Sequence, residues 1–296
     1  MPLRLGRLPE DRSKPRLALA PHLLAAIPPA SADWYSRVRA WGELGNTLWG
    51  CCVFSGNGHI IEQQTALGEA SETIVTDTET LAEYSAVTGF NPDAGPPGSN
   101  PTDQGAQIQD GLADLRKNGL AGQKIAAFAR VNQGDPTEVK TALAELGAVS
   151  LGVNLPQSAM DQFDAGQPWT VSGDATILGG HCIIAVGYDA EYVYIVSWGK
   201  VVPATWEWLA AYSEEAWAVI SAMWAGENSK DPEGVDLQGL GQEFAALTGD
   251  PNPFPAAPAP DPAVVLEQAA ELIRQIAASA KKDIYEAMAF LAKNNL

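Results

Sequence analysis

Two segments of the sequence carry side chains suited to nucleophilic catalysis. Residues 45–67, GNTLWGCCVFSGNGHIIEQQTAL, place Cys51 and Cys52 after a glycine-bounded turn and before a pattern that predicts a helix. A thiol at a helix N-terminus meets the positive end of the helix dipole, which favours the nucleophilic thiolate. Residues 179–199, GGHCIIAVGYDAEYVYIVSWG, predict two strands, with His181 at the start of the first. A cysteine followed about 130 residues later by a histidine is the order of nucleophile and base in one class of thiol enzymes.

The sequence around these residues resembles the papain-like (C1-type) cysteine peptidases over about residues 30–220. Trp34 precedes Cys52 by 18 residues and Asn46 precedes it by six, which are that family's spacings from an early tryptophan and from the oxyanion-hole glutamine to the nucleophile. The other matching segments are ADWYSRV at 32–38, VKTALAELGAVSLGVNL at 139–155, GGHCIIAVGYD at 179–189, and VSWG at 196–199 where the family has NSWG. The order and spacing of these motifs together carry the resemblance.

The resemblance implies a fold and a set of roles. The fold class is α+β, papain-like, with a helical subdomain facing a mostly antiparallel sheet and with an extended N-terminal arm and a C-terminal helix added. Cys52 would attack an acyl carbon, and His181 would take the thiol proton and later protonate the leaving amine. Asn46 and the backbone N–H of Cys52 would stabilise the oxyanion. The implied activity is that of a cysteine peptidase or amidase acting on a peptide or protein substrate.

The nucleophile region departs from the family pattern in two ways. Asn46 stands where papain has glutamine, so the amide donor is one methylene shorter. An alternative alignment, on Phe54 and Ser55, would make Cys51 the nucleophile. The spacings from Trp34 and Asn46 favour Cys52.

The residue that orients the histidine also differs. Val196 occupies the position of the family's asparagine, and valine cannot hydrogen-bond an imidazole. Ser197 is the nearest polar candidate. Side chains alternate faces along a strand, so an odd-length turn at 189–191 aims Ser197 toward the His181 face and an even-length turn aims Val196 there.

The chain also resembles a group of papain-like proteins encoded by actinobacterial phages and prophages. They share the pattern GN-x4-DC-x6-H, in which Cys51 replaces the aspartate, Cys52 is the cysteine and His59 is the histidine, and an arm of the type LGRLPEDRSKPRLAL. This resemblance implies a location in the host cytoplasm or in the virion. It also implies a second function, that of a catalytically inactive structural or assembly protein of the virion. The partners would then be virion proteins or a second copy, bound through residues 263–296.

Composition argues against several other functions. The 296-residue chain carries 18 basic and 36 acidic residues, a formal net charge of −18, which disfavours binding to nucleic-acid phosphates. No apolar run approaches the length of a membrane-spanning helix, and Pro21 and His22 interrupt the apolar stretch that a signal peptide would need. Nucleotide-binding signatures are absent, so no cofactor is expected. A zinc site is disfavoured because the only candidate ligands include two adjacent residues and no CxxC pair; they are Cys51, Cys52, His181 and Cys182.

The chain is predicted to have four segments. They are an extended basic arm at 1–32, a papain-like domain at 33–226, a polar and proline-rich linker at 227–262, and an amphipathic helix at 263–296. A short helix is expected within the linker, at 237–247. Residues 1–40 hold seven basic and three acidic residues, whereas residues 41–260 hold seven and 28. The arm is therefore expected to fold onto this acidic body or onto another acidic subunit.

Overall fold

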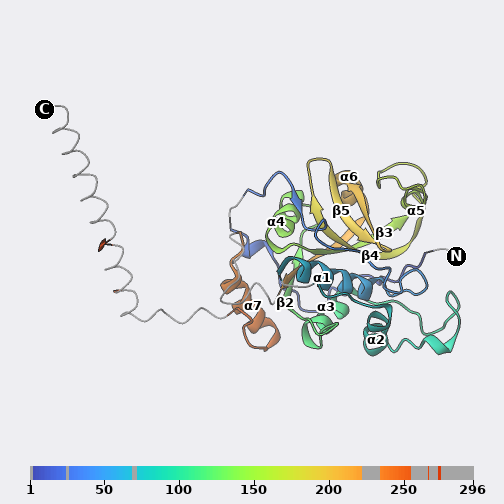
Figure 1. Cartoon of the computed structure of the whole chain (residues 1–296), viewed down its shortest axis with the longest axis horizontal. Helices are drawn as coiled ribbons and strands as arrows, with labels where there is room; N and C mark the ends of the chain where they lie inside the picture. The colour runs from blue at the N-terminus through green and yellow to red at the C-terminus, as the bar shows by residue number, and fades with distance from the viewer. Residues whose placement is uncertain are drawn as a thin grey trace, which may run out of the picture. The chain divides into compact units, whose positions relative to one another are not determined.

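A seven-stranded antiparallel sheet forms the centre of the molecule (Figure 1). The computed structural model of the chain describes residues 3–24, 27–68, 72–221, 234–254, 266 and 273–274. The strand order is β2-β7-β3-β4-β5-β6, and the short β1 pairs with the end of β4. The strand bounds are β1 Ala32–Asp33, β2 Ile125–Val131, β3 Val149–Pro156, β4 Ile177–Tyr188, β5 Tyr192–Ser197, β6 Lys200–Thr205 and β7 Ser213–Ser221.

Helices pack on both faces of this sheet, as alternation along the strands requires. One face forms a core cluster with α1 (Cys52–Gly68), α2 (Asp77–Thr88) and α3 (Ile108–Lys117). The other face forms a second cluster with α4 (Pro136–Leu146), α5 (Gln157–Asp164) and α6 (Trp206–Tyr212). Ile184 belongs to the first cluster and its neighbour Ile183 to the second. This arrangement confirms the expected α+β class.

Helix α1 is the central helix of the molecule. It begins at Cys52, and every residue from 52 to 65 is buried, which is typical of a helix enclosed on all sides. Glycines allow its close approach to its neighbours. A Cβ on Gly56 would lie 2.9 Å from the Cδ1 atom of Ile184 on β4. The packing of α1 on β4 joins the two segments that carry the candidate chemistry.

The turn between β4 and β5 and a β-bulge next to it together fix which residues of β5 face His181. It contains three residues, 189–191, and the Asp189 carboxylate accepts the backbone N–H groups of Glu191 and Tyr192 at 2.8 and 2.7 Å. Ile184 pairs with Val196 in the resulting hairpin. Beside the turn, Tyr188 pairs with Val193 and Gly187 with Tyr194, a register that on its own would bring Val196 to the His181 face. The β-bulge between Ala185 and Gly187 shifts the pairing by one residue, so Ser197, and not Val196, lies on the side of the sheet that carries His181.

The arm lies on the acidic body over the residues that the structure describes. Leu17 and Leu19 are core residues of the second cluster, and the backbones of Leu17, Leu19 and Arg130 exchange hydrogen bonds. A further helix, α7 (Leu237–Thr248), lies where the short helix at 237–247 is expected, and its Leu240 and Phe244 join the same cluster. Most of the predicted helix at 263–296 falls outside the described residues, and the limits of the four segments stay predictions.

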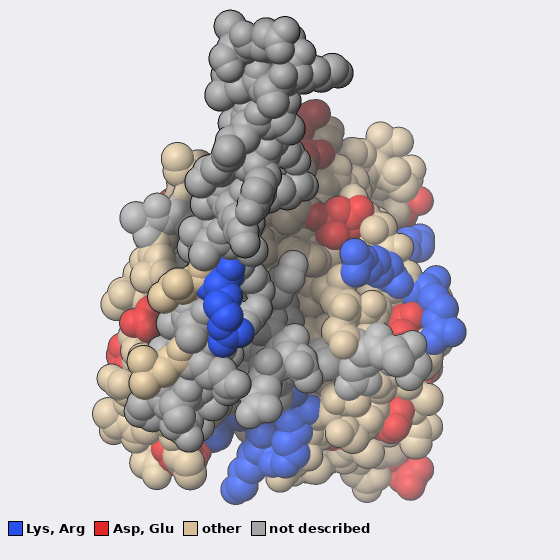
Figure 2. Space-filling model, turned by 60° about the vertical axis from the view of Figure 1, so that its left-hand side comes forward, with Lys and Arg blue, Asp and Glu red and all other residues tan. Residues whose placement is uncertain are grey.

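The surface carries charges of both signs. On the face shown in Figure 2, the described Lys and Arg side chains lie in small separate groups among Asp and Glu side chains. None of the described helices is both long and apolar enough to cross a membrane.

Candidate active site

The Cys52 thiol lies beside the strand that carries the candidate base. Cys52 is the first residue of α1, and its Sγ atom accepts the backbone N–H of Cys182 at 3.4 Å. Cys182 directly follows His181 on β4. The packing of α1 against β4 therefore brings the Cys52 sulfur to the peptide group that joins His181 to Cys182, 129 positions further along the sequence. No hydrogen bond between this sulfur and the His181 imidazole is formed among the described residues.

The His181 imidazole is held by Ser197 and Trp198. Its Nε2 atom lies 2.8 Å from the Ser197 hydroxyl, and its ring stacks on the Trp198 indole with centroids 4.3 Å apart and planes 13° apart. The Nδ1 atom is buried and has no hydrogen-bond partner among the described residues. With the proton on Nε2, which donates to the hydroxyl, Nδ1 carries the lone pair that could accept a proton from a thiol.

The turn that holds Trp198 is strained. Trp198 has φ 45° and Gly199 has φ 74°, so both central residues of the β5–β6 turn lie in the left-handed region. That conformation suits a two-residue hairpin but is unfavourable for a residue as bulky as tryptophan. The stacked contact with His181 is one of the contacts that hold this residue in place.

Asn46 presents its side-chain amide to a peptide carbonyl. Its Nδ2 atom donates to Trp49 O at 3.0 Å and to Arg4 O at 3.4 Å, and the Trp198 indole N–H donates to the same Arg4 oxygen at 3.3 Å. Arg4 belongs to the arm. The amide expected to serve as an oxyanion donor thus points at a carbonyl of the segment that lies over the site.

Cys51, the alternative nucleophile, faces a different part of the molecule. Its sulfur contacts Leu44 O and the Ser55 hydroxyl, both at 3.6 Å, and burial raises the pKa of its thiol. These contacts belong to the core around α1 and not to the strand of His181. The geometry therefore favours Cys52 over Cys51.

The arm crosses the thiol and seals it from solvent. Ala106 N donates to Gly6 O and Leu8 N donates to Ala106 O, both at 2.8 Å, while Arg7 N donates to Gly180 O at 3.0 Å on the opposite side. The backbone N–H of Gly6 also lies near enough to the Cys52 sulfur to lower the pKa of its thiol. Cys52 and His181 are each 1% exposed. A molecule from solvent can reach the thiol only where the arm has moved away.

Glycines form the bed on which this part of the arm lies. A Cβ on Gly6 would overlap the Gly50 carbonyl, a Cβ on Gly105 would overlap Gly6 O, and a Cβ on Gly180 would overlap Arg7 O. Backbone therefore meets backbone on both sides of the arm, which is a close approach that only glycine permits.

Burial keeps both candidate catalytic groups uncharged beneath the arm. It raises the pKa of the Cys52 thiol to about 11, although the N–H groups of Cys182 and Gly6 and the charge of Arg7 act in the opposite direction. Burial and the charge of Arg7 lower the pKa of His181 to about 3. At neutral pH the covered site holds a thiol and a neutral imidazole, and no thiolate–imidazolium pair.

Sequence reasoning missed Arg7 and its partners. The Arg7 guanidinium is buried and bonds two adjacent glutamates of β7, Glu214 and Glu215. The only signal in the sequence was the position of Glu215 directly before a run of residues that reads as a buried strand, because a charge at such a position needs a partner.

Comparison with solved structures identifies the papain-like fold. Xylellain, a cysteine protease from Xylella fastidiosa, superposes with a TM-score of 0.55 at 17% identity, covering 74% of this chain and 96% of that one. The Carica candamarcensis cysteine protease CMS1MS2 gives 0.47 at 15% identity, covering 65% and 99%, and digestive procathepsin L 3 of Tenebrio molitor gives 0.47 at 16%, covering 74% and 75%. No protein-family model and no curated relative matches the sequence.

Proposed function

We propose that this chain, which has the papain-like fold, is a cysteine peptidase or amidase with Cys52 as nucleophile and His181 as base. The observation that carries this proposal is the placement of the Cys52 sulfur on the backbone N–H of Cys182, next to a histidine whose Nδ1 is unpaired and whose Nε2 is held by Ser197. A thiol at a helix N-terminus beside an oriented imidazole is the arrangement that activates a nucleophile.

The reaction is acyl transfer through a thioester. Cys52 Sγ forms a bond to the substrate carbonyl carbon while its proton passes to His181 Nδ1. The carbonyl oxygen takes the negative charge, which Asn46 Nδ2 and the backbone N–H of Cys52 stabilise. The C–N bond then breaks, and the imidazolium gives its proton to the leaving amine. Water attacks the thioester with His181 as base, which releases the acid and returns the proton to the thiol.

The supporting geometry belongs to a closed state. The arm occupies the place of a substrate, and its Arg4 carbonyl receives the Asn46 amide that the mechanism assigns to the oxyanion. Activity in this scheme requires the arm to leave the thiol. Water then re-enters the site, so the raised pKa of Cys52 falls and the lowered pKa of His181 rises.

The test compares the two neighbouring cysteines. In a chain whose arm has been loosened by Gly6→Ala, an unfolded protein such as reduced, alkylated casein is offered as substrate and new amino termini are counted. Cys52→Ala is expected to abolish the hydrolysis, and the matched variant Cys51→Ala to retain it. Hydrolysis that survives Cys52→Ala at an unchanged rate would refute the proposal.

The second function, an inactive papain-like assembly protein of a phage virion, is favoured by one observation. The thiol and the imidazole are both buried and uncharged beneath a well-packed arm. A folded chain with accessible Cys52 that alkylates slowly at all pH values and hydrolyses nothing would favour this function. The phage setting itself stays a prediction of the sequence.

A further inference from the structure

The Arg7 side chain enters a pocket that is built for a guanidinium group. Its Nη1 atom donates to Glu215 Oε1 at 2.9 Å, and its Nη2 atom donates to Glu214 Oε2 at 2.8 Å and to Asn154 Oδ1 at 3.0 Å. The carbonyl of Val153 lies 3.5 Å from the same Nη2 atom. We call these four acceptors, on β3 and β7, the guanidinium pocket. Arg7 itself is only 5% exposed.

The walls of the guanidinium pocket belong to the body of the molecule. A Cβ on Gly152 would lie 2.7 Å from Arg7 Cδ and 2.5 Å from Glu215 Cγ, so a glycine there leaves room for the arginine stem. Glu215 is fully buried, and its second oxygen accepts the Trp217 indole N–H at 2.8 Å. Glu215 is thus held by a hydrogen bond within the body as well as by Arg7 of the arm.

A β-bulge brings the second glutamate to the same pocket. Gly152 pairs with Glu215 and Val153 pairs with Ser213, so Glu214 is an extra residue on β7. An extra residue re-aims the neighbouring side chain, and Glu214 reaches Arg7 although adjacent strand residues normally face opposite ways. Asn154 Nδ2 holds the other oxygen of Glu214 at 2.6 Å.

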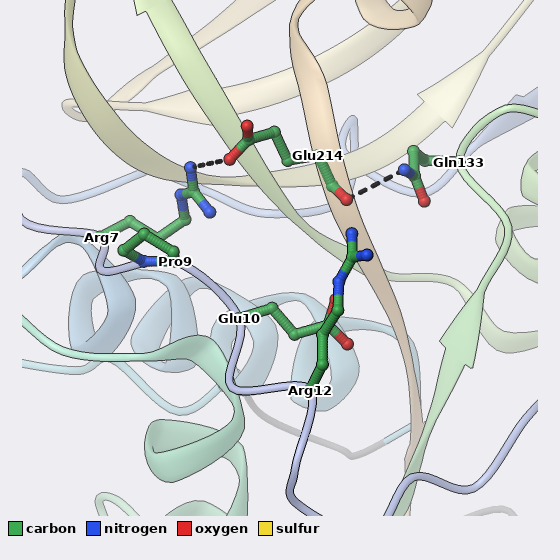
Figure 3. A pocket seen from close by; sticks show the side chains of 6 residues that line it. All are labelled: Arg7, Pro9, Glu10, Arg12, Gln133 and Glu214. Atoms are coloured by element: carbon green, nitrogen blue, oxygen red, sulfur yellow. Dashed lines mark hydrogen bonds and ion pairs between the residues drawn. The ribbon is translucent and has the colours of Figure 1, made fainter.

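The guanidinium pocket lies close enough to the candidate nucleophile and base for the charge of Arg7 to act on both of them. Arg7 fills the pocket and directly follows Gly6, whose N–H lowers the pKa of the Cys52 thiol. The N–H of Arg7 itself donates to the carbonyl of Gly180, the residue before His181. Any peptide that replaces the arm in this groove must place a side chain at this point. Beside the guanidinium pocket lies a hollow of about 330 Å³, lined by Arg7, Pro9, Glu10, Arg12, Gln133 and Glu214, and Figure 3 shows Arg7 pointing at the carboxylate of Glu214 there.

The chemistry of the guanidinium pocket discriminates among side chains. An apolar side chain would leave the buried carboxylate of Glu215 without its cation, which is strongly unfavourable. Four acceptors around two terminal nitrogens also match the planar, forked guanidinium better than the single ammonium of lysine. The pocket thus complements arginine first and lysine second.

We propose that the guanidinium pocket is the specificity site of this enzyme, that it selects peptides with an arginine side chain, and that Arg7 is its internal occupant in the closed chain. This proposal rests on the proposed function, because it concerns which peptides reach Cys52.

The test uses the full chain carrying Gly6→Ala and Arg7→Ala, which loosens the arm and empties the guanidinium pocket. The probes are the peptide LRLGRLP, which has the sequence of residues 3–9, and the same peptide with citrulline in place of its second arginine. Citrulline has nearly the same shape as arginine and no charge. The readout is protection of Cys52 from iodoacetamide, located by peptide mass spectrometry, so it requires no turnover.

The arginine peptide is expected to give half-maximal protection at a concentration at least about tenfold below that of the citrulline peptide, because a charged hydrogen-bonded pair is lost. Adding Glu215→Gln is expected to reduce this preference to less than about twofold. Adding the matched variant Arg16→Ala, which alters a surface ion pair with Glu10, is expected to leave it unchanged. Equal protection by the two peptides, protection by neither, or a preference that survives Glu215→Gln would overturn the proposal.

If the double variant Gly6→Ala, Arg7→Ala fails to fold, a second measurement replaces the protection assay. The single variant Arg7→Ala is then titrated with n-propylguanidinium and with n-propylammonium while its thermal midpoint is followed. A rise with the guanidinium ion alone supports the guanidinium pocket, and equal responses overturn it. Cleavage of the two peptides is scored separately. An arginine peptide that protects but is not cleaved contradicts the peptidase function alone, whereas equal cleavage of both peptides contradicts the specificity alone.

Discussion

The variant Gly6→Ala should convert Cys52 from an inert thiol into a reactive one. A Cβ at this position would overlap the carbonyl of Gly50, which is backbone and cannot rotate away. The arm must lift there, which uncovers a sulfur that is now 1% exposed. Burial is the largest cause of the raised pKa of Cys52, so exposure should lower that pKa even though the N–H of Gly6 and the charge of Arg7 withdraw at the same time.

The size of the effect follows from the ionisation. Cys52 has a pKa of about 11 beneath the arm, against an ordinary value of 9.0. A shift of two units changes the thiolate fraction at neutral pH by about 100-fold. The second-order rate of alkylation of Cys52 by iodoacetamide at pH 7 should therefore rise by between about 10-fold and 100-fold, the lower bound allowing for the lost contacts with the arm.

The assay follows the alkylation rate between pH 6 and 10 by peptide mass spectrometry, with Gly134→Ala as the control. Gly134 lies in an exposed loop where a Cβ would meet only a side-chain oxygen of Asn132, at 3.3 Å. The control should react as slowly as the unaltered chain. A folded Gly6→Ala chain with an unchanged rate and an unchanged pH midpoint would refute the reasoning that the arm silences the site.

Two further variants test the support of the imidazole and the buried charges. Ser197→Ala removes the hydroxyl that holds His181 Nε2, so kcat/KM for peptide hydrolysis should fall about 10-fold; an equal fall in Val196→Ala, whose side chain faces away, would contradict this role. Burial raises the pKa of Glu83 to about 8, above its ordinary value of 4.5, so the folded chain holds a proton that the unfolded chain releases as pH rises between these values, and stability falls. In Glu83→Gln the side-chain oxygen can still accept the Asn57 amide N–H, but no carboxyl group titrates. The free energy of unfolding, measured in urea from pH 5 to 8, should therefore rise relative to that of the unaltered chain by at most about 1.4 kcal/mol per pH unit. A gain in the free energy of unfolding that does not depend on pH would contradict the raised pKa of Glu83.

The sequence predicts the parts of the site that depend on local spacing. The helix begins at Cys52 because a glycine-bounded turn precedes it, and His181 stands on the first strand of a hairpin. The choice between Ser197 and Val196 depends on the β-bulge between Ala185 and Gly187, which could be read only once the pairing of the two strands was known. The catalytic roles of these residues stay predictions.

The sequence does not predict the path of the arm or its buried ion pairs. The excess of positive charge in residues 1–40 indicates that the arm binds an acidic surface. Net charge does not determine in which direction the arm runs over that surface or which residues it contacts. Arg7 and Glu215 are 208 positions apart, and no periodicity links them. The bulge that aims Glu214 is a property of how β3 and β7 pair, which is fixed by tertiary packing.

The double backbone pairing of the arm limits the shape of anything that takes its place. Ala106 on one side and Gly180 on the other both hydrogen-bond the arm, and paired strands lie about 4.8 Å apart. The space between the two backbones is thus about 10 Å, whereas an α-helix with its side chains is about 10–12 Å wide and offers no free N–H groups along its length. Only a single extended strand can enter. Chain termini, long loops and unfolded segments meet this condition, and a compact helical target would first have to unravel.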